Sequence, residues 1–330
     1  MLEKKLAQLL TSENEANVLL AFEMAKGDAQ IRQALEQLLQ GYYTLYRCFL
    51  NQESTSAEDM QVTDIIQLNQ PKLELRNNDI GTVPPEIALL QNLTTLNLSF
   101  NEIKQLPKAI KELTLLNNLV LRFNQLTQLP TEITQLSNLQ WLDLQGNFLS
   151  ALPSEIGQLK LLKNLHLSQN KLTTLPPEIG QLQSLDTLDL EQNQLTSLPD
   201  EIGQLKNLKV LQLEHNRLKS LPVSLGQLKN LQLLRVIDNQ LQDLPADLTQ
   251  WKKVYTIDLD HNQLQHLPLA ICQLPNLTSL SLVGNQLTEL PEAMQKLDKL
   301  RFLNLTGNPM NATTLEKIKD WFPICRITFD

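Results

Sequence analysis

One asparagine recurs every 23 residues through most of this 330-residue chain. Eleven asparagines keep the spacing without a slip: Asn78, Asn101, Asn124, Asn147, Asn170, Asn193, Asn216, Asn239, Asn262, Asn285 and Asn308. Leucine or another apolar residue holds fixed places around each of them, while the residues between vary freely. Such a period predicts one structural unit repeated along the chain. Because a single unit cannot bury its apolar side alone, the units must stack on one another.

The alternation within each unit predicts a short strand followed by a sharp turn. Leu165 and Leu167 alternate with His166, so the leucines should face the core and His166 the other side. The amide of Asn170 should be buried in the turn and bonded to backbone groups of its own and neighbouring units, so that the asparagines form a ladder. After Pro176, a short helical or 3₁₀ segment should return to the leucines.

The pattern L-x-x-L-x-L-x-x-N-x-L resembles leucine-rich repeat proteins over about residues 70–311. The L-P-x-E-I-G-x-L half of the unit, at residues 152–159, 175–182 and 198–205, is similar to cytoplasmic and bacterial members with 23-residue units. The resemblance implies an α/β leucine-rich repeat solenoid, a horseshoe or arc with parallel strands on its concave face. It also implies partner binding, which family members share, rather than any one reaction.

Four segments are expected along the chain. They are a helical N-terminal cap at residues 1–50, a linker at 51–69, eleven repeats at 70–311 and a helix-plus-strand C-terminal cap at 312–330. Ser12 with Glu15 predicts a capping box, Gly27 a helix end and Asp28 a second helix start. The N-terminal helices could instead form a small adaptor bundle with its own partner.

The C-terminal cap should contain a helix that starts at Thr313 or Thr314 and runs through Leu315 and Ile318. The following residues ICRITF should add an edge strand. Both elements would cover the leucines of the last repeat.

Composition limits the partner and the compartment. A net charge of −8 and an isoelectric point near 5.2 argue against nucleic acid, whose phosphates the chain would repel. Residues 1–25 lack the apolar core of a signal peptide, and no apolar run is long enough to span a membrane. The three cysteines are widely separated and odd in number. We therefore expect a cytoplasmic protein.

The sequence lacks the motifs of an enzyme or a cofactor site. It has no glycine-rich phosphate loop, no G-x-S-x-G turn and no paired-cysteine metal spacing. His215 and His261 hold equivalent places two repeats apart, which at about 4.8 Å per strand separates them by roughly 10 Å. Asp258 and Asp260 predict a solvated face rather than a closed metal shell. We expect no enzyme, no cofactor and no metal.

The variable strand face carries two kinds of side chain that are typical of interfaces. An aromatic and arginine group lies in the early repeats: Arg76, Phe100, Arg122, Phe123, Trp141 and Phe148. We place Phe100 and Phe123 in the slots before and between the leucines, stacked about one strand spacing apart. Aromatic and arginine clusters dominate interface energetics, although these rings could merely stack on each other.

The same face becomes acidic along the array and keeps a few apolar and basic residues. These are Asp143, Asp189, Glu191, Glu214, Asp238, Asp258 and Asp260, with Arg217, Arg235, Leu233 and Ile237. Carboxylates would attract a basic partner and reject acidic competitors. The sequence thus predicts a non-catalytic protein-binding scaffold whose partner has a basic and apolar surface.

Two other classes of function stay open. Small-ligand or glycan recognition would need a pocket, whereas the sequence predicts a shallow open face. A structural role would use self-association through Tyr42, Tyr43 and Tyr46 or through the terminal ICRITF strand. We expect a monomer, with the oligomeric state left open.

Overall fold

The computed structural model describes residues 2–50 and 56–329, which form two compact units divided between Phe148 and Leu149. The loop expected at residues 51–55 lies outside the described part. None of the described helices is both long enough and apolar enough to cross a bilayer.

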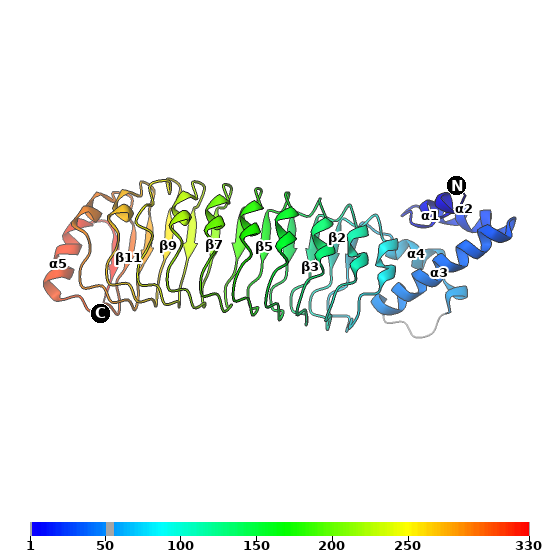
Figure 1. Ribbon diagram of the computed structural model, residues 1–330, viewed down its shortest axis with the longest axis horizontal. Helices are drawn as coiled ribbons and strands as arrows, with labels where there is room; N and C mark the ends of the chain where they lie inside the picture. Colours follow the sequence, from blue (N-terminus) through cyan, green and yellow to red (C-terminus); the bar gives the residue numbers. More distant parts are fainter. Residues whose placement is uncertain (1, 51–55, 330) are drawn as a thin grey trace. The chain divides into compact units, whose positions relative to one another are not determined.

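The first unit begins with helices (Figure 1). Their bounds are α1 Leu2–Leu10, α2 Glu15–Lys26, α3 Ala29–Leu50 and α4 Val62–Leu68, with a 3₁₀ helix at Ala57–Asp59. A helix thus occupies much of the segment expected as a linker. The capping box at Ser12 was wrong: Asn14 is the N-cap of α2, and its Oδ1 accepts from the Ala16 N–H at 2.9 Å. Gly27 ends α2, and Asp28 Oδ1 accepts from the Gln30 N–H at 2.8 Å.

Polar contacts join the helices to one another and to the first repeats. The Tyr42 hydroxyl donates to Asn69 Oδ1 at 2.6 Å, and Asn69 Nδ2 donates to the Leu10 carbonyl at 2.7 Å. Asn92, in the first repeats, donates to the Thr11 carbonyl at 2.6 Å. Tyr42 and Tyr46 are buried inside the unit and Tyr43 is half-buried, so the tyrosine surface suggested for self-association is largely internal.

Every repeat contributes a three-residue strand, as the alternation predicts. The first unit holds β1 Lys72–Glu74, β2 Thr95–Asn97, β3 Asn118–Val120 and β4 Trp141–Asp143. The second holds β5 Asn164–His166, β6 Thr187–Asp189, β7 Val210–Gln212, β8 Leu233–Arg235, β9 Thr256–Asp258, β10 Ser279–Ser281, β11 Phe302–Asn304 and β12 Arg326–Thr328. Within each unit, neighbouring strands are parallel and follow the order of the chain.

Short 3₁₀ helices return the chain after each proline. They are Pro85–Leu89, Lys108–Glu112, Thr131–Gln135, Ser154–Gln158, Pro177–Gln181, Asp200–Gln204, Val223–Gln227, Leu269–Gln273 and Glu292–Lys296. The repeat that lacks one, before β9, is filled by the indole of Trp251, which is fully buried and donates to the Leu225 carbonyl at 3.0 Å. In this repeat a large buried side chain therefore takes the place of the 3₁₀ helix in the core.

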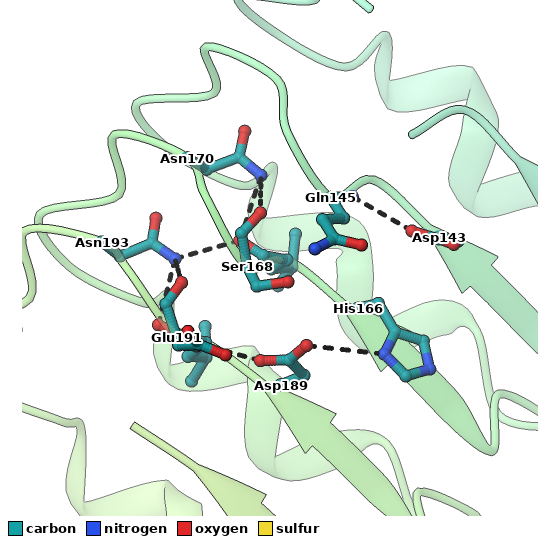
Figure 2. A network of polar contacts seen from close by, with 10 residues as sticks. Asp143, Gln145, His166, Ser168, Asn170, Asp189, Glu191 and Asn193 are labelled. Atoms are coloured by element: carbon teal, nitrogen blue, oxygen red, sulfur yellow. Dashed lines mark hydrogen bonds and ion pairs between the residues drawn. The ribbon is translucent and has the colours of Figure 1, made fainter. Parts of the chain in front are cut away.

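The predicted asparagine ladder is confirmed. Asn193 Nδ2 donates to the carbonyls of Leu167, Leu190 and Glu191 at 3.0, 3.1 and 3.2 Å (Figure 2). Its Oδ1 accepts from the Leu172 N–H at 3.0 Å. One side chain thus satisfies backbone groups of two successive repeats, which would otherwise be buried without partners.

A second asparagine ladder was missed. In several repeats the asparagine before the first leucine of the L-x-x-L-x-L pattern donates to a carbonyl 24 residues earlier, as from Asn207 to Gln183 at 2.6 Å and from Asn230 to Lys206 at 2.7 Å. The recurring Asn-Leu pair at these places was the available signal.

The second unit ends in α5 Ala312–Trp321 and the edge strand β12, which pairs in parallel with β11. The expected edge strand is confirmed. The helix start was wrong, because Asn311 is the N-cap, and its Oδ1 accepts from the Thr314 N–H at 2.9 Å.

Candidate functional site

Four positions of each repeat lie on the strand face, opposite the buried leucines. They are the first and third strand residues, the residue two before the ladder asparagine and the residue directly before it. The last position has a left-handed backbone in repeat after repeat, with φ between 51° and 73° from Phe100 to Gly307. We call it the left-handed column. Its members are Asn77, Phe100, Phe123, Gly146, Gln169, Gln192, His215, Asp238, His261, Gly284 and Gly307.

Phe100 and Phe123 lie in this column and not in the strand slots we expected. The alternation of the strand does not extend to the residue before the ladder asparagine, because the left-handed turn changes the direction of the chain there. The alternation therefore cannot predict where the two rings point. Their rings stack as predicted, with centroids 4.7 Å apart and planes at 30°. Arg76 Cζ lies 4.6 Å and Arg122 Cζ 5.6 Å from the Phe100 ring centroid. We call these four residues the aromatic stack.

Gly146 lies beneath the aromatic stack, a role that was not predicted from the sequence. A Cβ at Gly146 would overlap the ring of Phe123, so the ring lies directly over the glycine backbone. His261 and Gly284 repeat this arrangement, since a Cβ at Gly284 would lie 2.6 Å from His261 Nδ1. The sequence signal for this arrangement is a glycine in the left-handed column 23 residues after an aromatic residue of the same column.

The other residues of the predicted aromatic group lie near the stack in sequence but differ in setting. Trp141 is half-buried and is the first residue of β4. Phe148 is 45% exposed and follows Asn147, outside the four strand-face positions. Asp143 is only 7% exposed, and its Oδ1 accepts from the Gln145 N–H at 3.1 Å (Figure 2).

Histidines on the strand face pair with aspartates one repeat later. His166 Nδ1 lies 3.6 Å from Asp189 Oδ2 (Figure 2), and His215 Nδ1 lies 3.1 Å from Asp238 Oδ2. Burial alone would raise the pKa of Asp189, but the His166 contact and the Glu191 N–H outweigh it and lower that pKa. These histidine–aspartate pairs of adjacent repeats were not predicted, because only the histidines two repeats apart share one position in the unit.

The acidic residues of the second unit share the strand face with Leu233, Arg235 and Ile237, which are half-buried. We use the name acidic surface for Asp189, Glu191, Glu214, Asp238, Asp258 and Asp260. Glu214 is 6% exposed. Burial, aided by the charge of Glu191, raises its pKa to about 7. Burial and the neighbouring Asp260 raise the pKa of Asp258 to about 6.

Metal and small-ligand sites have little geometric support in the described residues. Their histidines, cysteines and acids form no group of three arranged to hold a metal ion. Cys272 is buried in a 3₁₀ helix, and burial raises the pKa of its thiol. An open hollow of about 440 Å³ lies among the loops at Leu106 and Leu129, beside the Lys108–Glu132 ion pair. It is lined by loops of adjacent repeats and includes none of the predicted site residues.

Comparison with known proteins gives matches along most of the repeats. A family model described as a leucine-rich repeat region matches residues 115–190 and 155–243, and a leucine rich repeat model matches residues 71–126 and 252–310. No curated protein matches the chain.

Three solved structures illustrate the likeness. A leucine-rich repeat protein of Leptospira interrogans is 37% identical over 78% of this chain and 83% of that chain, with a TM-score of 0.45. The ectodomain of an Arabidopsis thaliana membrane receptor kinase, in complex with Casparian strip integrity factor 2, is 31% identical over 78% of this chain, with a TM-score of 0.62. An internalin of Listeria monocytogenes is 21% identical over 89% of both chains, with a TM-score of 0.62.

The chain spans only 34% of the plant receptor ectodomain, but 83% of the Leptospira protein. The matched models cover the same residues in which asparagine ladders and parallel strands recur at 23-residue intervals. This chain belongs to the leucine-rich repeat proteins.

Proposed function

We propose that this protein is a non-catalytic scaffold that binds another protein through its strand face. The observation that carries the proposal is the aromatic stack. Phe100 and Phe123 have φ of 57° and 53°, a backbone conformation that costs a bulky L residue about 1–2 kcal/mol. Glycine, which holds three other places in the column, would avoid this cost. The same backbone occurs at other non-glycine members of the column, so what distinguishes this pair is its two stacked rings flanked by Arg76 and Arg122, a combination typical of interface hot spots.

The chemistry of the face suggests the kind of partner. The aromatic stack and Trp141 offer flat apolar surface edged by guanidinium groups, as in interface hot spots. The acidic surface would attract basic groups and raise the association rate. We therefore propose a partner that carries both apolar and basic side chains. The Arabidopsis receptor, solved in complex with Casparian strip integrity factor 2, is consistent with this class of function.

We also propose a reducing, cytoplasmic location. Cys48, Cys272 and Cys325 are unbonded to one another, and burial raises the pKa of each thiol, which disfavours oxidation. Fractionation of the source cells tests this point separately from binding.

Site-directed photo-crosslinking tests the binding proposal. A benzoylphenylalanine at Val120, which is half-buried on the strand face of β3, should capture a partner in the source cells. The same group at Lys111, exposed on a 3₁₀ helix of the same unit, is the matched control and should not. Capture from Lys111 alone would place the binding surface elsewhere and refute the proposal.

A further inference from the structure

Glu214 occupies an unusual place on the acidic surface. It lies two residues before Asn216, at a strand-face position, yet its side chain is only 8% exposed. Its Oε2 atom is buried and has no hydrogen-bond partner among the described residues. An ionised carboxylate with an unsatisfied buried oxygen is costly, so a donor that reached it would be strongly favoured.

The charges that face Glu214 come from both neighbouring repeats. Glu191 and Asp189 lie on the side of β6, and Arg235 lies on β8. Gln212 and His215 flank it in its own repeat, and His215 is engaged with Asp238. One cation therefore faces several carboxylates.

Arg235 satisfies this group incompletely. Its Nη1 lies 3.9 Å from Glu214 Oε1, which is beyond hydrogen-bond length, and its side chain is 43% exposed. In the sheet, Arg235 is paired with Asp258 of β9, and its charge also acts on that carboxylate. The charge of this half-exposed guanidinium thus acts on two acids, and in the contacts described it lies within hydrogen-bond length of neither.

We propose that Glu214, with Glu191 of the preceding repeat, forms a binding site for an arginine side chain of the partner protein, and that Arg235 competes for this site when the partner is absent. The inference rests on the proposed function and specifies the chemistry that the acidic surface recognises. A guanidinium fits better than an ammonium because its planar donors can pair with two carboxylate oxygens at once and it is more weakly hydrated.

Competition and proton coupling follow from this arrangement. Replacing Arg235 removes the competing cation and should strengthen arginine binding. Burial together with Glu191 and Asp189 raises the pKa of Glu214 to about 7, while Arg235 opposes that rise. An arriving guanidinium favours the ionised carboxylate and so releases a proton near and below this pH. Arginine affinity should therefore fall as the pH is lowered from 8 to 5.5.

The test uses N-acetyl-arginine amide as the probe and the neutral isostere N-acetyl-citrulline amide as its control. Each is titrated into the ¹⁵N-labelled full chain while amide shifts are followed by NMR. Saturable shifts should appear around Glu191 and Glu214 with the arginine probe alone. Arg235→Gln should tighten binding about three- to ten-fold, and Glu214→Gln should weaken it at least as much. Asp243→Asn, an exposed carboxylate of the same unit, should leave binding unchanged.

Two results would overturn the inference. One is the absence of saturable shifts in both the unaltered chain and Arg235→Gln at tens of millimolar probe. The other is weaker binding of the arginine probe by Arg235→Gln with an otherwise native spectrum, since the removal of a competing cation cannot lower the affinity for the probe. Either result would refute the arginine site only. Capture of a partner through Val120 would still show binding at the strand face, so the proposed function is tested independently.

Discussion

The ladder asparagine shows how one side chain fixes the register of a whole repeat. Its amide donates to three carbonyls and accepts from a backbone N–H, and only asparagine combines both abilities at this length. Aspartate has nearly the same shape but no donor.

Asn193→Asp should therefore be strongly destabilising. The carboxylate would place an acceptor against the carbonyls of Leu167, Leu190 and Glu191, so we expect a loss of about 2–4 kcal/mol in the free energy of unfolding by urea. Gln169→Glu, at an exposed position of the left-handed column, is the control and should change it by less than about 0.5 kcal/mol. Equal effects would mean that the ladder does not hold the turn.

The left-handed column gives a second prediction at this scale. Phe123→Ala loses the ring but keeps a strained backbone, whereas Phe123→Gly loses the ring and relieves the strain. We expect Phe123→Gly to be more stable than Phe123→Ala by about 1 kcal/mol. Chemical denaturation of both variants measures the difference. If alanine proved as stable as glycine, the backbone at Phe123 would not be strained.

Glu214 predicts an unusual dependence of stability on pH. Its pKa is about 7 in the folded chain, above its ordinary value of 4.5. The folded state then binds more protons than the unfolded state between these values, so this group makes stability fall as the pH rises from about 4.5 to about 7. Glu214→Gln should be more stable than the unaltered chain at pH 8, and its advantage should vanish near pH 4.5. Denaturation across this range measures both curves; a constant difference would contradict the account.

At the scale of the element, the close approach of successive 3₁₀ helices decides which residues are allowed. A Cβ at Gly203 would overlap the carbonyl oxygen of Ser224 in the next repeat. Gly81 has nothing within 4 Å of the equivalent atom. These glycines differ in surroundings, although the sequence shows the same residue.

Gly203→Ala should accordingly cost about 1–3 kcal/mol, because backbone must move to admit the methyl group. Gly81→Ala should be neutral or slightly stabilising. Thermal unfolding of the two variants gives the comparison, and a neutral Gly203→Ala would show that the helices are less tightly stacked than the structure indicates.

The elements also show what could be predicted from sequence. Strands, 3₁₀ helices and the asparagine ladder were predictable because each follows from residues within one 23-residue period. The position of Phe123 on the strand face was not predicted because a residue with left-handed backbone interrupts the alternation of inward and outward side chains. The burial of Asp143 and Glu214 was also missed, since it depends on side chains of neighbouring repeats that vary freely. Asn14 rather than Ser12 caps α2, because the Ser12 hydroxyl accepts from the Asn14 N–H instead of from the first turn of the helix.

At the scale of the whole molecule, the same hydrogen-bond scheme serves both units while their strand faces differ in chemistry. The first carries the aromatic stack, and the second carries the acidic surface, within a chain of net charge −8. The scaffold residues are uniform because they are buried, and the strand-face residues differ because stacking does not constrain them. Binding specificity is therefore expected to lie in the latter.

The affinity of the crosslinked partner for Phe123→Ala/Trp141→Ala, measured by calorimetry with the purified proteins, tests this account most directly. Truncation of hot-spot residues costs about 2 kcal/mol or more, so the double variant should bind at least about 30-fold more weakly. Leu115→Ala, which removes an exposed apolar side chain outside the four strand-face positions, should bind normally. An unchanged affinity of the folded double variant would contradict recognition through the aromatic stack and Trp141.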